Sequence, residues 1–232
     1  MLPLRDDIPS RRFPAVNLLL IVVTTLVFFY ELSLGEALVP FLRHYGFVPA
    51  RFVAQGQTGP LDPERFLPVF ASIFLHGGFL HLIGNMWMLW IFGDNVEDIL
   101  GHGRYLLFYL LCGVAAVAFQ GMVHPGATVP MVGASGAISG VLGAYLLSFP
   151  RARILTLVPL FIFFYMIEVP AFIYLILWFV MQFLQGSANL AGGMEGGGVA
   201  WWAHVGGFIA GMILLPVLGG RPRPRSRGRL TW

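Results

Sequence analysis

The chain has 232 residues, of which 57% are hydrophobic and 11% charged, and its formal net charge is +3. Soluble domains carry about 25% charged residues. This composition, with a mean hydropathy of +0.79, excludes an ordinary soluble domain and predicts a chain that lies in a lipid bilayer. The single cysteine, Cys112, excludes an internal disulfide.

Apolar segments long enough to span a bilayer recur along the chain. The uncharged run from Tyr105 to Pro150 would be about 69 Å long as one helix, roughly twice the hydrocarbon thickness. It must therefore contain two spans, separated by the prolines and glycines of residues 124–133. The sequence thus predicts an all-α polytopic membrane protein, a six-transmembrane-helix bundle with a membrane-associated first outer loop. The predicted spans are residues 14–34, 79–98, 104–123, 134–149, 169–186 and 200–219.

The N-terminal part is predicted to be a cytoplasmic segment, residues 1–13, followed by the first span. Arg11 and Arg12 lead into that span without a signal-peptide cleavage site, so we expect the first helix to be retained. Residues 35–78 form the first outer loop. The six-span domain then covers residues 14–219.

The C-terminal half contains two unusual segments and a basic tail. The fourth span is short, and we expect its neighbours to shield it from lipid. Residues 154–168 are interrupted by Pro159 and Glu168, so we expect them to lie along the membrane interface rather than to extend the fifth span. The tail, residues 220–232, is interpreted as touching anionic lipid rather than nucleic acid.

The arginines predict the orientation. They supply all the positive side chains, because lysine is absent, and with the N-terminus inside eleven of the 14 fall on the inner side. Arginine-rich short loops stay cytoplasmic, so both termini are predicted to be cytoplasmic and the first loop to be outside. Asp94, Glu97 and Asp98 are expected to form a solvated, cap-like cluster at the inner face.

Polar residues lie near the outer ends of three alternate spans. His76, His81 and Asn85 stand at the start of the second, Ser135 at the start of the fourth and His204 near the start of the sixth. Polar groups in a membrane are costly, and they usually meet one another or a water-filled cavity. We therefore predict that one site is formed by His81, Asn85, Ser135 and His204.

Glycine spacing makes this meeting plausible. Gly136 and Gly140 in the fourth span, and Gly207 and Gly211 in the sixth, have the spacing that lets helix backbones approach closely. Gly207 is three residues after His204 and therefore on roughly the same helix face. The face that packs thus also presents the imidazole.

These residue types permit acyl transfer. A serine becomes a nucleophile when a neighbouring histidine takes its proton, so we interpret Ser135 and His204 as a Ser–His dyad. His81 and Asn85 would donate hydrogen bonds to the oxyanion, helped by the N–H groups at the helix start that carries Ser135. A carboxylate partner is not expected, since only Glu195 could approach His204 from the outside.

Taken together, these motifs resemble the rhomboid family of intramembrane serine proteases, and the resemblance covers the whole six-span core. It is carried by H-xxxx-H-xxx-N (His76, His81, Asn85), G-x-S-G (Gly133 to Gly136) and A-H-x-x-G-xxx-G (Ala203 to Gly211).

The resemblance implies a serine endopeptidase that cleaves transmembrane protein substrates near the outer leaflet. Ser135 would be the nucleophile and His204 its base, His81 and Asn85 would line the oxyanion hole, and His76 would help to order the first outer loop. The supporting positions are Gly133, Gly136 and Gly207. No metal or organic cofactor and no nucleic acid is implied, and the oligomeric state stays open.

The resemblance also implies surroundings for this site. Residues 187–199 would be a mobile cap, the fifth span a lateral gate, and the membrane a bacterial inner membrane.

The chain departs from the family pattern twice. No tryptophan precedes Trp87, so the Trp-Arg of the first outer loop is missing. Ser139 stands four residues after the nucleophile, where many members have an aromatic residue. We therefore expect His204 to be held by packing with alanine and glycine or by Ser139.

Two other functional classes remain open. A rhomboid-like membrane chaperone or binding protein would need neither Ser135 nor His204. A metal-dependent hydrolase or a transporter could use His76, His81 and His204, but the i, i+5 spacing of the first two splays them on a helix, and the H-E-x-x-H glutamate is absent. Taken alone, a serine in a membrane helix more often donates a hydrogen bond to the carbonyl four residues before it than acts as a nucleophile.

Overall fold

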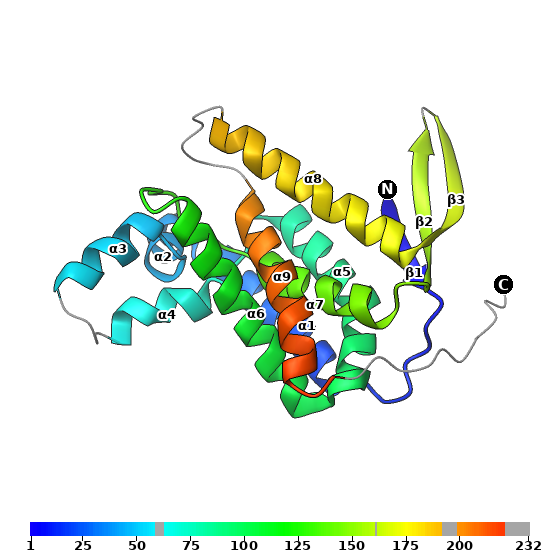
Figure 1. The fold of residues 1–232 in the computed structure, drawn as a ribbon. Helices are drawn as coiled ribbons and strands as arrows, with labels where there is room; N and C mark the ends of the chain where they lie inside the picture. Colours follow the sequence, from blue (N-terminus) through cyan, green and yellow to red (C-terminus); the bar gives the residue numbers. More distant parts are fainter. Residues whose placement is uncertain (59–62, 161, 192–198, 221–232) are drawn as a thin grey trace.

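The computed structural model describes residues 1–58, 63–160, 162–191 and 199–220. Most of this is a helical bundle, and a small sheet stands at one end of it (Figure 1). The helices are α1 (Ala15–Ser33), α2 (Leu38–Tyr45), α3 (Pro49–Thr58), α4 (Pro63–Ala71), α5 (Phe79–Leu100), α6 (His102–Val123), α7 (Ser135–Ser148), α8 (Ala171–Ala191) and α9 (Trp201–Val217), with a 3-10 turn η1 (Gly35–Ala37). The strands are β1 (Leu2–Asp6), β2 (Arg153–Leu160) and β3 (Phe163–Pro170).

The centre of the bundle is α7, which packs against α5, α6 and α9 (Figure 1). Its residues from Gly136 to Tyr145 are all buried. A helix of this length is about 21 Å long, shorter than the hydrocarbon thickness of about 30 Å. Its neighbours enclose it, as its shortness predicts.

Glycines let α7 and α9 touch backbone to backbone. A Cβ added to Gly207 would lie 2.0 Å from the carbonyl oxygen of Gly136, and one added to Gly211 would lie 1.9 Å from that of Gly140. No side chain fits at such distances. The predicted small-residue faces are therefore the contact between these two helices.

The described helices agree with a multi-pass membrane protein. Three of them, α1, α6 and α8, are long and apolar enough to cross a membrane, and α7 and α9 are apolar but shorter. The second predicted span is α5, which is as long as α6 but carries several polar side chains, His81 and Asn85 among them. The count of six spans stays a prediction.

The sheet was not predicted. Of residues 154–168, the described ones before and after residue 161 lie mainly in the antiparallel strands β2 and β3, in which Ile154 pairs with Val169 and Leu157 with Met166. The N-terminal strand β1 completes the order β1-β2-β3 by pairing with β2. The segment is rich in β-branched and aromatic residues, which favour strands, and Pro159 would break a helix.

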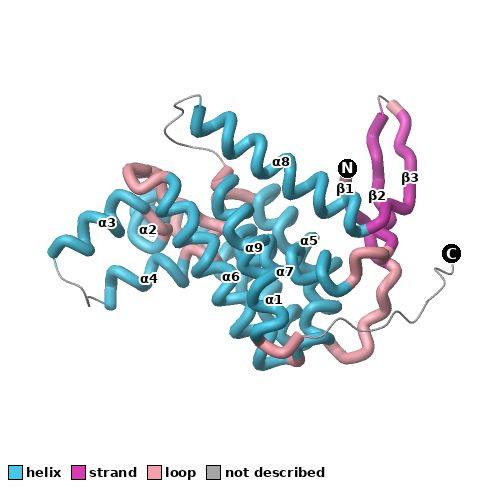
Figure 2. The backbone as a smooth tube through the Cα atoms, in the orientation of Figure 1, coloured by secondary structure: helices cyan, strands magenta, loops and turns pink. Residues whose placement is uncertain are grey.

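The sheet lies at the end of the bundle where α7 ends and α8 begins (Figure 2). The Ala171 amide donates to the Ala152 carbonyl over 2.8 Å, and the Trp87 indole of α5 donates to the Pro3 carbonyl of β1 over 2.6 Å. The orientation predicted from the arginines makes this the inner end.

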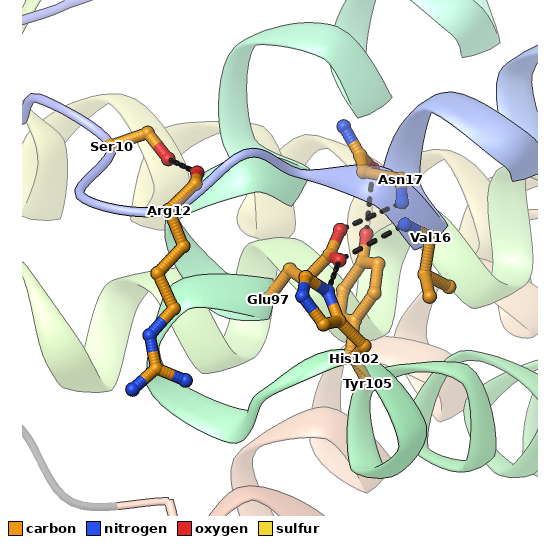
Figure 3. Close-up of polar contacts among 7 residues, drawn as sticks. All are labelled: Ser10, Arg12, Val16, Asn17, Glu97, His102 and Tyr105. Atoms are coloured by element: carbon orange, nitrogen blue, oxygen red, sulfur yellow. Dashed lines mark hydrogen bonds and ion pairs between the residues drawn. The ribbon is translucent and has the colours of Figure 1, made fainter.

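The inner-end acids are not a solvated cluster, because Glu97 is only 2% exposed. Its carboxylate accepts the backbone N–H groups of Val16 (3.0 Å) and Asn17 (2.7 Å) at the start of α1, and it contacts His102 Nδ1 at 2.5 Å. The Tyr105 hydroxyl donates to the Asn17 side chain over 2.8 Å (Figure 3). A carboxylate at the positive end of α1 thus joins α1, α5 and α6.

Candidate active site

Ser135 and His204 lie side by side. Ser135 is the first residue of α7 and His204 is in the first turn of α9, and the Ser135 Oγ is 2.8 Å from the His204 Nε2. The close approach of Gly136 to Gly207 brings these two helix starts together. The arrangement has the geometry of a nucleophile and its base; the catalytic roles themselves stay a prediction.

The other ring nitrogen of His204 has a partner that sequence reasoning missed. Gln182 of α8 places its Oε1 2.7 Å from the His204 Nδ1, and both side chains are only 7% exposed. An amide oxygen can only accept a hydrogen bond, so Nδ1 carries the proton. The lone pair of Nε2 then faces the Ser135 hydroxyl. The available signal was a polar residue inside an apolar span, which by default marks a functional position.

Aromatic rings from two helices flank the imidazole. The ring centre of Trp178, on α8, is 5.9 Å from that of His204, and that of Trp201 is 6.1 Å away. Ser139 does not hold His204, because its hydroxyl donates to the Ser135 carbonyl over 2.6 Å. The aromatic support therefore comes from α8 and α9, and not from the position four residues after Ser135.

His81 lies against the turn that leads into α7. Gly133 has a φ of +131°, and a Cβ added there would be 2.7 Å from both Cε1 and Nε2 of His81. Only glycine combines this backbone with this approach. Gly133 thus lets the His81 ring come close to the chain that carries Ser135.

Asn85 and His76 form a pair beside this turn. The Asn85 Nδ2 lies 2.9 Å from the His76 Nε2, and the His76 and His81 ring centres are 5.0 Å apart. Burial, with His81 nearby, lowers the pKa of His76 to about 4. His76 is therefore neutral near pH 7 and accepts from Asn85. A primary amide has two N–H donors, so Asn85 keeps a second one for another acceptor.

His76 also links the end of the first outer loop to α1. Its backbone N–H lies 3.2 Å from both carboxylate oxygens of Glu31. Nearby, the Gly133 N–H donates to the Ser72 carbonyl over 2.9 Å. These contacts join the backbone at His76 to α1 and the backbone at Ser72 to the turn before α7. The loop-ordering role of His76 stays a prediction.

The first outer loop has an anchor in place of the missing Trp-Arg. The Arg51 guanidinium donates to the carbonyls of Arg43 (2.5 Å), His44 (3.1 Å) and Gly46 (2.9 Å). Phe47 exchanges backbone hydrogen bonds of 3.0 and 2.8 Å with Met131. The loop is thus joined to the segment that precedes Ser135.

The proposed cap and the C-terminal tail lie partly or wholly outside the described residues. Of the cap, residues 187–191 belong to the C-terminal end of α8, whereas residues 192–198, with Glu195, are outside the described residues, as is the tail from residue 221.

A three-histidine metal centre has no support in the described part of the chain, where no three metal-ligating side chains converge.

Comparison with known families identifies the fold. A family model for the Rhomboid domain matches residues 63–221, more than half of the chain. The chain belongs to the rhomboid family. It is 35% identical over 134 residues to the rhomboid protease GluP of Bacillus subtilis, a match that covers 57% of this chain and 24% of that protein.

Other rhomboid relatives come from eukaryotes. Identity to the human presenilin-associated rhomboid-like protein, mitochondrial, is 34% over 109 residues, or 46% of this chain and 29% of that protein. Identity to RHOMBOID-like protein 5 of Arabidopsis thaliana is 31% over 185 residues, or 80% of this chain and 52% of that protein. The chain thus spans less than a third of the human relative.

Membership of the family and the apolar helices make this an integral, multi-pass membrane protein. The relatives include mitochondrial and plant proteins, so they do not support the expected bacterial inner membrane.

Proposed function

We propose that this rhomboid is an intramembrane serine endopeptidase that cleaves transmembrane protein substrates near the outer leaflet. The observation that carries the proposal is the 2.8 Å separation of the Ser135 Oγ from the His204 Nε2. Membership of a family that includes a protein named as a rhomboid protease supports it.

In the proposed reaction, His204 Nε2 takes the Ser135 proton while the Ser135 oxygen attacks the scissile carbonyl. His204 then gives that proton to the leaving amine, and water hydrolyses the acyl-enzyme by the same proton transfers. Gln182 accepts from Nδ1–H throughout, and so it holds the imidazole in one tautomer and stabilises the imidazolium.

The oxyanion would form beside the N-terminus of α7. The Ser135 N–H and the side chains of His81 and Asn85 are the proposed donors, and each such donor is worth about 10²–10³ in kcat. Gly133 supports this hole by admitting the His81 ring, while Gly136 and Gly207 set the distance between α7 and α9.

The proposed domain covers residues 14–219, with an N-terminal segment of residues 1–13 that contributes β1 to the sheet, and a basic tail of residues 220–232. The arginine distribution supports cytoplasmic termini. This orientation turns the starts of α7 and α9, and hence the site, toward the outer leaflet.

A serine-reactive fluorophosphonate tests the proposal. Covalent labelling of the purified protein, lost in Ser135→Ala and in His204→Ala, together with cleavage of a model transmembrane substrate, is the expected result. A protein that takes no label and does not cleave, while remaining folded, would instead be a non-catalytic membrane binder. Cleavage by Ser135→Ala at the wild-type rate would contradict the assignment of Ser135 as the nucleophile.

A further inference from the structure

A buried acidic side chain lies near the C-terminal end of α1, which is the outer end in the predicted orientation. Glu31 is only 1% exposed and stands in the last turn of a helix that is apolar and long enough to cross a membrane. An ionisable group in such a segment is costly, and it usually serves a functional site. The residues proposed above for the reaction come from other helices. The contacts of Glu31 therefore indicate what this carboxyl group supports.

Glu31 contacts the backbone of His76, which is 45 residues away in the sequence. Both carboxyl oxygens lie 3.2 Å from the His76 N–H, and His76 is itself buried. A buried N–H that loses its acceptor is destabilising. This contact therefore holds the chain at His76 against α1.

Two glycines separate His76 from the helix that carries Asn85. Gly77 and Gly78 precede Phe79, the first residue of α5, and a Cβ added to either glycine would meet no atom within 4 Å. Glycine restricts the backbone less than any other residue, so α5 alone does not dictate where the His76 ring lies. The tertiary contact with Glu31 supplies that constraint.

The His76 ring in turn orients the Asn85 amide. Its Nδ1 lies 3.3 Å from the Phe74 carbonyl oxygen, which can only accept, so Nδ1 carries the proton. The Nε2 of the neutral ring then accepts from the Asn85 Nδ2 over 2.9 Å. A reversed amide would put an oxygen, which repels an oxyanion, in place of the second N–H. The ring therefore fixes the amide in the orientation that the proposed oxyanion needs.

These contacts connect α1 to the oxyanion site in three steps. We propose that Glu31 is a positioning residue of the reaction, which holds His76 where its ring orients the Asn85 amide toward the oxyanion. The inference rests on the proposed protease function and deepens it. Because Glu31 acts through Asn85, its effect on kcat should disappear once the Asn85 amide is removed.

A double-mutant cycle in the full-length protein tests this. Glu31→Leu removes the acceptor, and kcat for a model transmembrane substrate should fall by about 5- to 50-fold with little change in KM, because a displaced donor keeps part of the about 10²–10³ that a well-placed one supplies. In the Asn85→Ala background, Glu31→Leu should lower kcat by less than about 2-fold, since residues that act as one unit are not additive. Glu31→Gln keeps an acceptor for the His76 N–H, so it should restore much of kcat.

The matched control is Glu36→Leu, which removes an exposed carboxyl group shortly after α1 and should leave kcat unchanged. Tm is measured for every variant. If Glu31→Leu does not fold, Glu31→Asp replaces it in the cycle, because it keeps the carboxyl group but draws it back by one methylene.

The other outcomes overturn this role. An equal loss of kcat from Glu31→Leu with and without Asn85 would show that Glu31 does not act through that amide. A lower Tm with wild-type kcat, or no rescue by Glu31→Gln, would make Glu31 a purely structural residue. Failure of the proposed function is seen separately: a folded wild type that neither cleaves nor takes the fluorophosphonate label contradicts the protease and the role of Glu31 with it. A wild type that does both leaves the cycle to decide on Glu31 alone.

Discussion

Gln182 on α8 is hydrogen-bonded to His204 on α9, so the helix that follows the hairpin is joined to the imidazole next to Ser135. The bond holds the proton on Nδ1 and leaves Nε2 free to accept from Ser135. Any displacement of α8 that breaks this bond would also leave the His204 ring free to rotate. We therefore assign Gln182 as a positioning residue of the proposed reaction.

Gln182→Leu keeps the approximate size of the side chain and removes the acceptor. It leaves a buried N–H unsatisfied, at about 1–3 kcal/mol, which predicts a fall in kcat of about 5- to 100-fold with little change in KM. Gln182→Glu retains an acceptor, so it should restore much of kcat and change the pH profile. Steady-state cleavage of a model substrate across pH measures both.

The matched control is Gln185→Leu, three residues further along α8. It should leave kcat near the wild-type value. An equal loss of kcat in Gln185→Leu, or no rescue by Gln182→Glu, would show that the Gln182 effect comes from α8 packing and not from the bond to His204.

Asn85→Ala separates an oxyanion role from a structural one. If Asn85 donates to the oxyanion, kcat should fall by roughly 10- to 1000-fold. One such donor is worth about 2.7–4 kcal/mol, and the proposed donor His81, which remains in the variant, reduces the loss. KM should change little. If Asn85 only joins helices, the loss should appear as about 0.6 kcal/mol of stability instead.

His76→Ala is the control for Asn85, because it removes the partner of the 2.9 Å contact and leaves the amide. kcat and Tm are measured for both variants on the same preparations. A loss of kcat in His76→Ala as large as in Asn85→Ala would assign the effect to the pair rather than to the amide.

The sequence predicted that Ser135 and His204 lie together, but it did not predict which other residues surround them. Ser135 and His204 could be paired because hydropathy fixes the order of the spans and polar groups in a membrane seek one another. Gln182 was missed because its use depends on the angle at which α8 crosses α9, which no local pattern encodes. The hairpin was missed for a similar reason, since β1 is more than 140 residues from its partner β2 and only tertiary contact brings the two together.

Gly207→Ala tests how the α7–α9 contact sets the dyad geometry. The added methyl group would meet the Gly136 carbonyl, a backbone atom that cannot move aside. Overpacking of this kind costs about 1–3 kcal/mol, so we expect a lower Tm. kcat should also fall, because separating the helices moves His204 away from Ser135.

Gly84→Ala is the matched control, since nothing lies within 4 Å of a Cβ added there. Alanine is also the better helix former, so this variant should have an unchanged or higher Tm and normal kcat. Wild-type Tm and kcat in Gly207→Ala would contradict the contact described between these helices.

Asp6 makes the docking of β1 dependent on pH. Its carboxylate accepts from the Asn95 side chain over 3.1 Å and from the Tyr145 hydroxyl. Burial raises the pKa of Asp6 to about 7, with Asp94 adding to the rise and the Tyr145 hydroxyl opposing it. A carboxyl group whose pKa is higher in the folded state than in the unfolded chain stabilises the fold while it is protonated. Its contribution is therefore complete below about pH 4 and is lost as the pH rises to about 7.

Asp6→Asn cannot ionise, so it should keep stability where the wild type loses it. The difference in Tm, mutant minus wild type, should increase between pH 5 and pH 8. Tyr145→Phe removes the hydroxyl that lowers the pKa of Asp6, so it should move the pH at which stability is lost upward. Thermal unfolding at a series of pH values measures all three proteins. Parallel pH profiles for wild type and Asp6→Asn would show that folding does not raise the pKa of Asp6, and would contradict a protonated Asp6 at the junction of β1, α5 and α7.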